Sequence, residues 1–197
     1  MSEKYQNTYR VESARLKGYD YTQEGLYFIT ICTQNRENYF GEIVNGKMQL
    51  SNIGTLANVF WHEIKNHSKN VELHEFVVMP NHIHGVLEIV NSVDSVDSVE
   101  TMHASSLPSS SLPSSSPQQP PKNEQMQKIS PKSGSVSRII GAYKSAVTKH
   151  AHRLGYQFEW QTRFYDHIIR TEADYKRIEN YITENPRNWD EDKFYNE

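Results

Sequence analysis

The chain has 197 residues, of which 36% are hydrophobic, and a formal net charge of −3 at pH 7. This charge gives no global reason to expect a polyanionic partner, so a nucleic-acid role would depend on local basic patches. The single cysteine, Cys32, excludes an internal disulfide and a cysteine-rich zinc site and suits a reducing compartment. No apolar run has membrane-spanning length and the N-terminus lacks the layout of a signal peptide, so we expect a cytoplasmic protein with no membrane partner.

One low-complexity segment interrupts the chain. Residues 91–133 contain thirteen serines and six of the eight prolines, and they contain no Phe, Tyr or Trp. Such a segment cannot bury enough apolar surface to offset the entropy of ordering it. We therefore predict a single domain formed by residues 1–90 and 134–197, interrupted by a disordered Ser/Pro-rich insertion at 91–133.

The first half of the folded part predicts a strand, a hairpin, a helix and two more strands. Residues 26–33 are rich in the β-branched and aromatic side chains typical of a central strand. Asn45-Gly46 separates two short strands and is a strong hairpin signal. Residues 51–67 place their apolar side chains on one helical stripe, and strands at 72–79 and 82–90 follow.

The second half predicts a helix, a strand and a last helix. Residues 135–154 have one apolar helical face and end before Gly155, while residues 158–170 alternate like a strand with one polar face. Thr171 suits the N-cap of a helix that closes at Asn185-Pro186. This order of elements predicts an α+β fold, an antiparallel sheet with helices packed on one face and the other face free to meet a ligand.

Two histidines are the most informative residues of the sequence. Side chains alternate along a strand, so His82 and His84 would leave the same face about 6 to 7 Å apart at Cα. The residues of opposite parity are apolar, which supports the strand. The two imidazoles can then converge on one metal ion. The alternative is a pair of half-exposed strand histidines that are hydrogen-bonded to their neighbours.

A tyrosine and an amide share one face of the last helix. Tyr181 and Asn185 are four residues apart, so a phenol hydroxyl and an amide oxygen would project one above the other. The alternative makes Tyr181 an amphipathic residue at the edge of the core and Asn185 a C-cap before proline.

Three segments in this order resemble a known family. The chain resembles the single-tyrosine transposases of the HUH endonuclease superfamily, most closely the REP-associated tyrosine transposases, in three segments. These are residues 79–84 (Met-Pro-Asn-His-Ile-His), residues 160–170 and residues 180–186. The resemblance extends from about residue 26 to residue 188. It implies a ferredoxin-like or RRM-like HUH fold.

The resemblance also implies an activity and a site. The enzyme would nick and rejoin single-stranded DNA at hairpins such as REP-like palindromes, through a 5′-phosphotyrosine on Tyr181, and would act as a monomer or homodimer. His82 and His84 would be metal ligands, and Asn185 stands where related transposases carry a polar third ligand, often glutamine. Mg²⁺ or Mn²⁺ is the expected ion, although imidazole ligands alone would tolerate Zn²⁺.

Several residues near these motifs are candidates for DNA contact. Arg163 and Arg170 lie within the matched segment 160–170 and could bind the DNA backbone. Lys144 is a helix lysine that could equally belong to a solvated face. Alternation leaves Tyr165 free to stack on an unpaired base. The histidine among them could also be a further ligand or have a structural role. The candidates are Lys144, Arg163, Tyr165, His167 and Arg170.

Other interpretations stay open. Tyr143 is a rival nucleophile, but it lies in the apolar stripe of its helix, which favours a core role. The whole protein could be a nucleic-acid-binding module that keeps the sheet without catalysis. A HUH replication initiator or relaxase would need further domains for which 197 residues leave no room.

Overall fold

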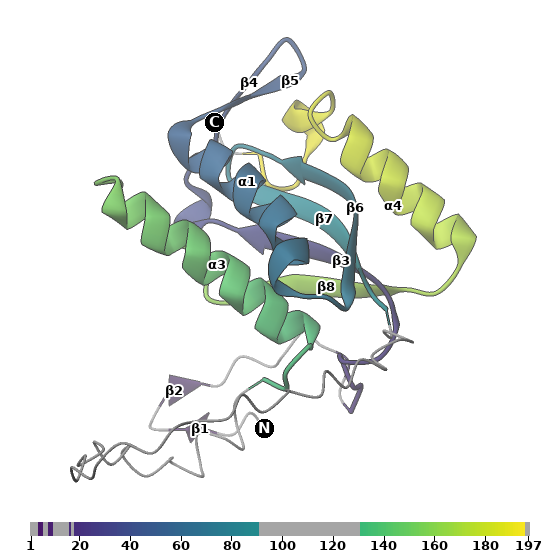
Figure 1. The fold of residues 1–197 in the computed structure, drawn as a ribbon. Helices are drawn as coiled ribbons and strands as arrows, with labels where there is room; N and C mark the ends of the chain where they lie inside the picture. Colours follow the sequence, from purple (N-terminus) through teal and green to yellow (C-terminus); the bar gives the residue numbers. More distant parts are fainter. Residues whose placement is uncertain (1–3, 6–7, 10–15, 17, 91–130, 196–197) are drawn as a thin grey trace, which may run out of the picture.

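A computed structural model describes residues 4–5, 8–9, 16, 18–90 and 131–195 (Figure 1). Almost all of the predicted insertion at 91–133 lies outside these described residues, so its disorder stays a prediction. Among the helices that the structure describes, none is both long enough and apolar enough to cross a membrane.

A four-stranded antiparallel sheet forms the centre of the protein, with strand order β6-β7-β3-β8. Its strands are β3 (Gly25–Cys32), β6 (Val71–Val78), β7 (His82–Ile89) and β8 (Tyr165–Ile169). Two separate pairs are β1 (Lys4–Tyr5) with β2 (Thr8–Tyr9), and β4 (Gly41–Val44) with β5 (Lys47–Leu50). The predicted hairpin at Asn45-Gly46 is confirmed, because both turn residues have the positive φ, 52° and 70°, that such a turn requires.

Three long helices occur in the described part of the chain, and each begins at a hydroxyl N-cap. They are α1 (Asn52–His67), α3 (Val136–Arg153) and α4 (Glu172–Glu184). The cap side chains of Ser51, Ser135 and Thr171 each accept a hydrogen bond from the backbone N–H three residues later. The predicted α+β class with an antiparallel sheet is therefore confirmed.

The main core lies between the sheet and the helix pair α1 and α3, which cover one face (Figure 1). The buried faces of these helices meet strand residues of one parity, including Ile83 and Leu87 of β7. Trp61 of α1 crosses β7 at Gly85, where an added Cβ would overlap the indole ring. Glycine at this position therefore permits the close approach of helix and sheet.

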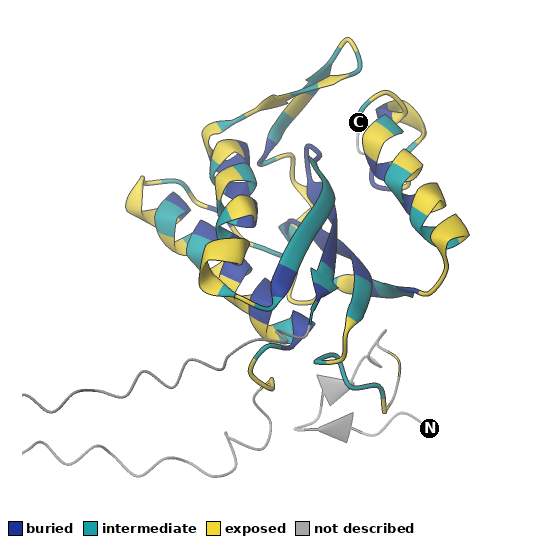
Figure 2. Ribbon diagram, turned by 45° about the vertical axis from the view of Figure 1, so that its right-hand side comes forward, coloured by how far each residue is buried: buried dark blue, intermediate teal, exposed yellow. Residues whose placement is uncertain are grey.

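The remaining helix, α4, lies on the opposite face of the sheet, as Figures 1 and 2 show. A second core cluster joins Ile178 and Ile182 of α4 to Phe28, Val86 and Ile169 of the strands. The prediction that all helices pack on one face thus holds for α1 and α3 but not for α4. The reason is that the strands carry apolar residues on both faces, so the histidine face also has an apolar part to cover.

The predicted strand at 158–170 is shorter in the structure. Only Tyr165–Ile169 pairs with β3, while Trp160 forms an isolated bridge to Thr33. Upstream of β8 the chain is held by single backbone contacts, such as the hydrogen bond that Gln161 N donates to Cys32 O. Alternation does distinguish Phe164, which packs against the main core, from Tyr165, which is exposed.

Candidate active site

The two histidines of β7 lie side by side on the face that α4 covers. His82 and His84 are both fully buried, and their ring centroids are 4.5 Å apart. The same face of the neighbouring strand β3 presents Thr30 opposite His84 and Cys32 opposite His82. The spacing of two residues in a strand therefore converges the imidazoles, as the sequence predicts.

Hydrogen bonds to the Nδ1 atoms leave the Nε2 atoms of both histidines available as ligands. His82 Nδ1 donates to the amide oxygen of Asn81 at 2.9 Å, so its proton is on Nδ1, and Nε2 is buried without a hydrogen-bond partner. His84 Nδ1 bonds Thr30 Oγ1 at 2.9 Å. When that oxygen accepts, His84 Nε2 carries a lone pair, and this atom faces the Tyr181 hydroxyl at 3.1 Å. This is the arrangement in which a histidine binds metal.

The surroundings favour neutral imidazoles. Burial lowers the pKa of His82 to about 3, with further contributions from the charges of Lys193 and Arg36. Burial and the neighbouring His82 hold the pKa of His84 well below its ordinary value. Both rings are therefore uncharged at neutral pH, which is the form that coordinates a cation.

The hydroxyl of Tyr181 reaches this pair from α4. It lies 3.1 Å from Nε2 of His84 and 3.2 Å from Oδ2 of Asp192, and the side chain is partly exposed. The ring packs edge-on against Phe28 on the sheet. Burial, followed by the negative charge of Asp192, raises the pKa of the phenol. Tyr181 therefore keeps its proton at neutral pH in this arrangement.

Asn185 lies one turn further along α4 and is also buried. Its Nδ2 donates to Asp192 Oδ2 at 2.9 Å, whereas its Oδ1 is buried and has no hydrogen-bond partner. Asn185 is also the C-cap residue of α4. The helix-end and ligand interpretations of Asn185 are thus compatible, because the free amide oxygen is available for an ion.

A carboxylate that the sequence analysis missed completes the cluster. Ligand atoms of His82, His84 and Asp192 all lie within 4.8 Å of one another. Asp192 follows the short 3₁₀ helix η2 (Trp189–Glu191), and its Oδ1 accepts a hydrogen bond from Phe194 N at 2.7 Å. It is one of three consecutive acidic residues, and nothing in that run distinguishes the one that folds back onto the sheet.

The residues present fit a divalent cation. Two imidazole nitrogens and one carboxylate converge, and two buried polar atoms of the site, His82 Nε2 and Asn185 Oδ1, have no hydrogen-bond partner among the described residues. A buried polar atom without a partner is costly unless a ligand satisfies it. This mixed nitrogen and oxygen set suits ions such as Mn²⁺, Mg²⁺ or Zn²⁺.

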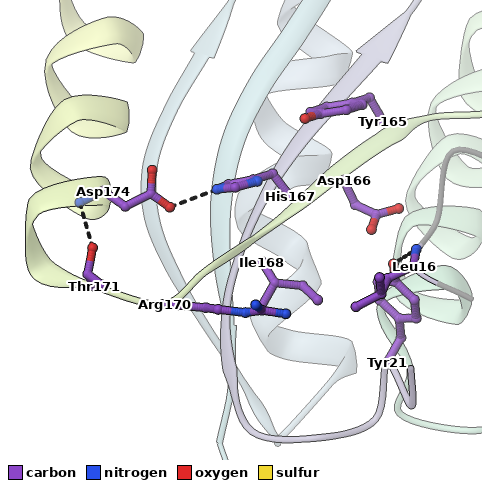
Figure 3. Close-up of a pocket in the computed structure, with 9 residues that line it drawn as sticks. All are labelled: Leu16, Tyr21, Tyr165, Asp166, His167, Ile168, Arg170, Thr171 and Asp174. Atoms are coloured by element: carbon purple, nitrogen blue, oxygen red, sulfur yellow. Dashed lines mark hydrogen bonds and ion pairs between the residues drawn. The ribbon is translucent and has the colours of Figure 1, made fainter. Parts of the chain in front are cut away.

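The predicted DNA-contact residues divide into two groups. Tyr165 and His167 lie on β8 and Arg170 follows it, and all three line a cavity of about 490 Å³ at the sheet edge (Figure 3). His167 bonds Asp174 at 2.7 Å and is not part of the histidine cluster. Lys144 lies instead on α3, at the other face of the sheet, where its Nζ donates to Gln161 O at 2.6 Å.

The remaining candidates behave as follows. Arg163 is exposed in the segment before β8. Tyr143 is buried in the main core, its hydroxyl donates to Ala57 O at 2.9 Å, and burial raises its pKa well above the ordinary value. The predicted core role of Tyr143 is confirmed. Cys32 is buried, as expected for a small apolar residue.

Comparison with solved structures identifies the fold, and comparison with known sequences identifies the family. The fold is similar to that of a REP-associated tyrosine transposase bound to a REP hairpin, with a TM-score of 0.53 and 18% sequence identity, covering 89% of this chain and 74% of that chain. An uncharacterized protein of Haemophilus influenzae is 36% identical over 185 residues, which make up 93% of this chain and 92% of that protein. The chain therefore belongs to the family of this Haemophilus protein. No family model matches it.

Proposed function

We propose that this protein is a metal-dependent enzyme that nicks and joins single-stranded DNA at hairpins, with Tyr181 as the nucleophile. The observation that carries the proposal is the distance of 3.1 Å between the Tyr181 hydroxyl and His84 Nε2, beside a second buried imidazole. A phenol next to a set of cation ligands is the arrangement that phosphoryl transfer to tyrosine needs. The similar transposase fold, solved with a REP hairpin bound, supports the choice of substrate.

Four residues would hold the ion: His82, His84, Asp192 and Asn185. When bound, a divalent cation polarises the scissile phosphate and stabilises the negative charge that develops on its oxygens. Asn81 and Thr30 would not contact the ion. Their hydrogen bonds to Nδ1 of His82 and Nδ1 of His84 orient the two imidazole rings.

The chemical step exchanges one phosphoester bond for another. The bond from Tyr181 Oη to phosphorus forms while the bond from phosphorus to the 3′ oxygen breaks. Asp192 Oδ2, at 3.2 Å, accepts the phenolic proton, and the departing 3′ oxygen takes a proton from water. The products are a 5′-phosphotyrosine and a free 3′-hydroxyl. Because the ester is conserved, the reverse reaction reseals or transfers the strand without ATP.

A covalent adduct tests this function directly. The protein is incubated with Mn²⁺ or Mg²⁺ and end-labelled single-stranded hairpins taken from its own genome, and the products are separated under denaturing conditions. We expect a labelled protein adduct that Tyr181→Phe abolishes. Tyr175→Phe is the matched control, because Tyr175 lies on the same helix but its hydroxyl donates a hydrogen bond to Glu75 and not to His82 or His84.

The same experiment separates the alternatives. An adduct that persists in Tyr181→Phe would rule out this nucleophile. Hairpin binding that needs no metal and yields no cleavage would favour a nucleic-acid-binding module without catalysis.

A further inference from the structure

A hydrogen bond joins strand β8 to the first turn of α4, outside the histidine cluster (Figure 3). His167 Nε2 lies 2.7 Å from Asp174 Oδ2, and both residues are half-buried. This bond is the largest of the contributions that lower the pKa of Asp174, so the carboxylate is charged at neutral pH. Neither residue belongs to the candidate ligand set.

Asp174 lies on the same side of α4 as the proposed nucleophile. Tyr181 follows it by seven residues, which is almost two full helical turns and about 10 Å along the helix axis. Both side chains turn toward the sheet, Asp174 to His167 of β8 and Tyr181 to His84 of β7. A rotation of α4 about its axis that breaks the first contact therefore also moves the Tyr181 hydroxyl away from His84.

Apolar packing alone leaves this rotation free. Ile178 and Ile182 attach α4 to a cluster of strand residues that includes Phe28. Hydrophobic contact is non-directional, whereas a hydrogen bond holds two atoms at a defined distance and angle. The bond between His167 and Asp174 thus adds a constraint on the rotation of the helix that burial does not supply.

The register of the sheet places this constraint close to the site. His167 lies directly opposite Phe28 in the pairing of β8 with β3. The ring centroid of Phe28 is 5.2 Å from that of His84 and 6.2 Å from that of Tyr181. The contact from His167 to α4 is therefore made beside the residues that meet in the candidate active site.

We propose that His167 and Asp174 are positioning residues for the reaction of Tyr181. Their hydrogen bond fixes the rotation of α4, which holds the Tyr181 hydroxyl beside His84 for attack on phosphorus. The pair itself contacts neither the DNA nor the ion. This inference rests on the proposed function, since Tyr181 is the group that is positioned. It also gives His167, which the sequence marks as a candidate for DNA contact, a different role.

The test measures formation of the covalent adduct in a single turnover, with the full chain and with hairpin DNA and Mn²⁺ at saturation. His167→Leu removes the hydrogen bond, and we expect the rate to fall by about tenfold or more, because a displacement of about 1 Å at a reacting group can cost up to about 100-fold. The affinities for hairpin DNA, measured in a Tyr181→Phe background, and for Mn²⁺ should not change. His167→Gln should restore most of the rate, because the glutamine amide can donate to Asp174.

Asp174→Ala removes the same hydrogen bond from the helix side and should slow the reaction to a similar extent. The double variant with His167→Leu should be no slower than either single variant, because one contact is lost in every case. Glu172→Ala and Arg177→Ala are the controls. Glu172 is an exposed carboxylate of the same helical turn, and Arg177 is the other partner of Asp174, so both variants keep the bond to His167 and should react at the parent rate.

The outcomes distinguish the positioning pair from the proposed function. If His167→Leu binds hairpin DNA more weakly but reacts at the parent rate when saturated, His167 is a DNA contact and the positioning role is wrong. If its rate and affinity both equal those of the parent, the bond only shapes the turn between β8 and α4, and the nucleophile still stands. If the parent chain forms no adduct at Tyr181, the proposed function and the positioning role are both overturned.

Discussion

Tyr181 of α4 and His84 of β7 are 97 residues apart in the sequence, yet the hydroxyl of one lies 3.1 Å from Nε2 of the other. The apolar contacts of Ile178 and Ile182 with the sheet hold α4 in the position that brings them together. The same helix contributes Asn185, one turn later, to the cluster. Packing of a single helix against the histidine face therefore assembles the nucleophile and part of the candidate ligand set at once.

Asp192→Asn should weaken metal binding. The substitution keeps the size of the side chain but removes the negative charge that faces two neutral imidazoles. We expect the affinity for Mn²⁺, measured by titration calorimetry on the protein without DNA, to fall by about tenfold or more. Asp190→Asn is the control, because Asp190 is exposed in the same acidic run. Equal affinity of the two variants would exclude Asp192 from the ligand set.

Thr30→Val should weaken metal binding without direct contact to the ion. Valine has nearly the shape of threonine but cannot form the hydrogen bond that joins Thr30 Oγ1 to His84 Nδ1, so the ring loses its orientation. We expect the Mn²⁺ affinity to fall by about 10- to 100-fold, the usual cost of losing such a partner.

The control for this prediction is Thr148→Val, since Thr148 lies on α3, on the far side of the sheet. A Thr30→Val protein that folds normally and binds Mn²⁺ as tightly as the parent would show that His84 does not depend on Thr30.

The sequence predicts local features of the site well, because they follow from local periodicity. Alternation along β7 is sufficient to put His82 and His84 on one face, and the four-residue spacing on α4 is sufficient to align Tyr181 with Asn185. The face that α4 covers could not be predicted in this way. Apolar residues of both parities occur along the strands, so neither face is marked as the solvent side.

Asp192 could not be predicted for a related reason. Its position depends on tertiary contacts of the C-terminal segment, such as the hydrogen bond from Asn81 Nδ2 to Phe194 O and the packing of the Phe194 ring 4.5 Å from that of His82. These contacts have no periodic signature in the sequence. The acidic run that contains Asp192 is equally compatible with a solvated surface.

Gly85→Ala should destabilise the fold, whereas Gly141→Ala should not. A Cβ at Gly85 would overlap the buried Trp61 ring, so we expect a loss of about 1–3 kcal/mol in the free energy of unfolding. Gly141 lies within α3 with open space around it, and alanine there should add about 0.5–1 kcal/mol through its helix propensity. Urea denaturation of both variants measures the difference. A neutral Gly85→Ala would mean that Trp61 does not pack on β7 as described.

Lys144 should react with acylating reagents faster than the exposed lysine of the same helix. Partial burial lowers the pKa of Lys144 to about 8, so near that pH a large fraction is the neutral, nucleophilic amine, whereas an ordinary lysine stays almost entirely protonated. Brief treatment with an N-hydroxysuccinimide ester at pH 8, followed by peptide mass spectrometry, should give about tenfold or more modification at Lys144 relative to Lys149. The preference should shrink as the pH is raised toward 11, because an ordinary lysine then also becomes largely neutral. Equal labelling at pH 8 would show that the hydrogen bond to Gln161 O or the surrounding side chains protect the amine.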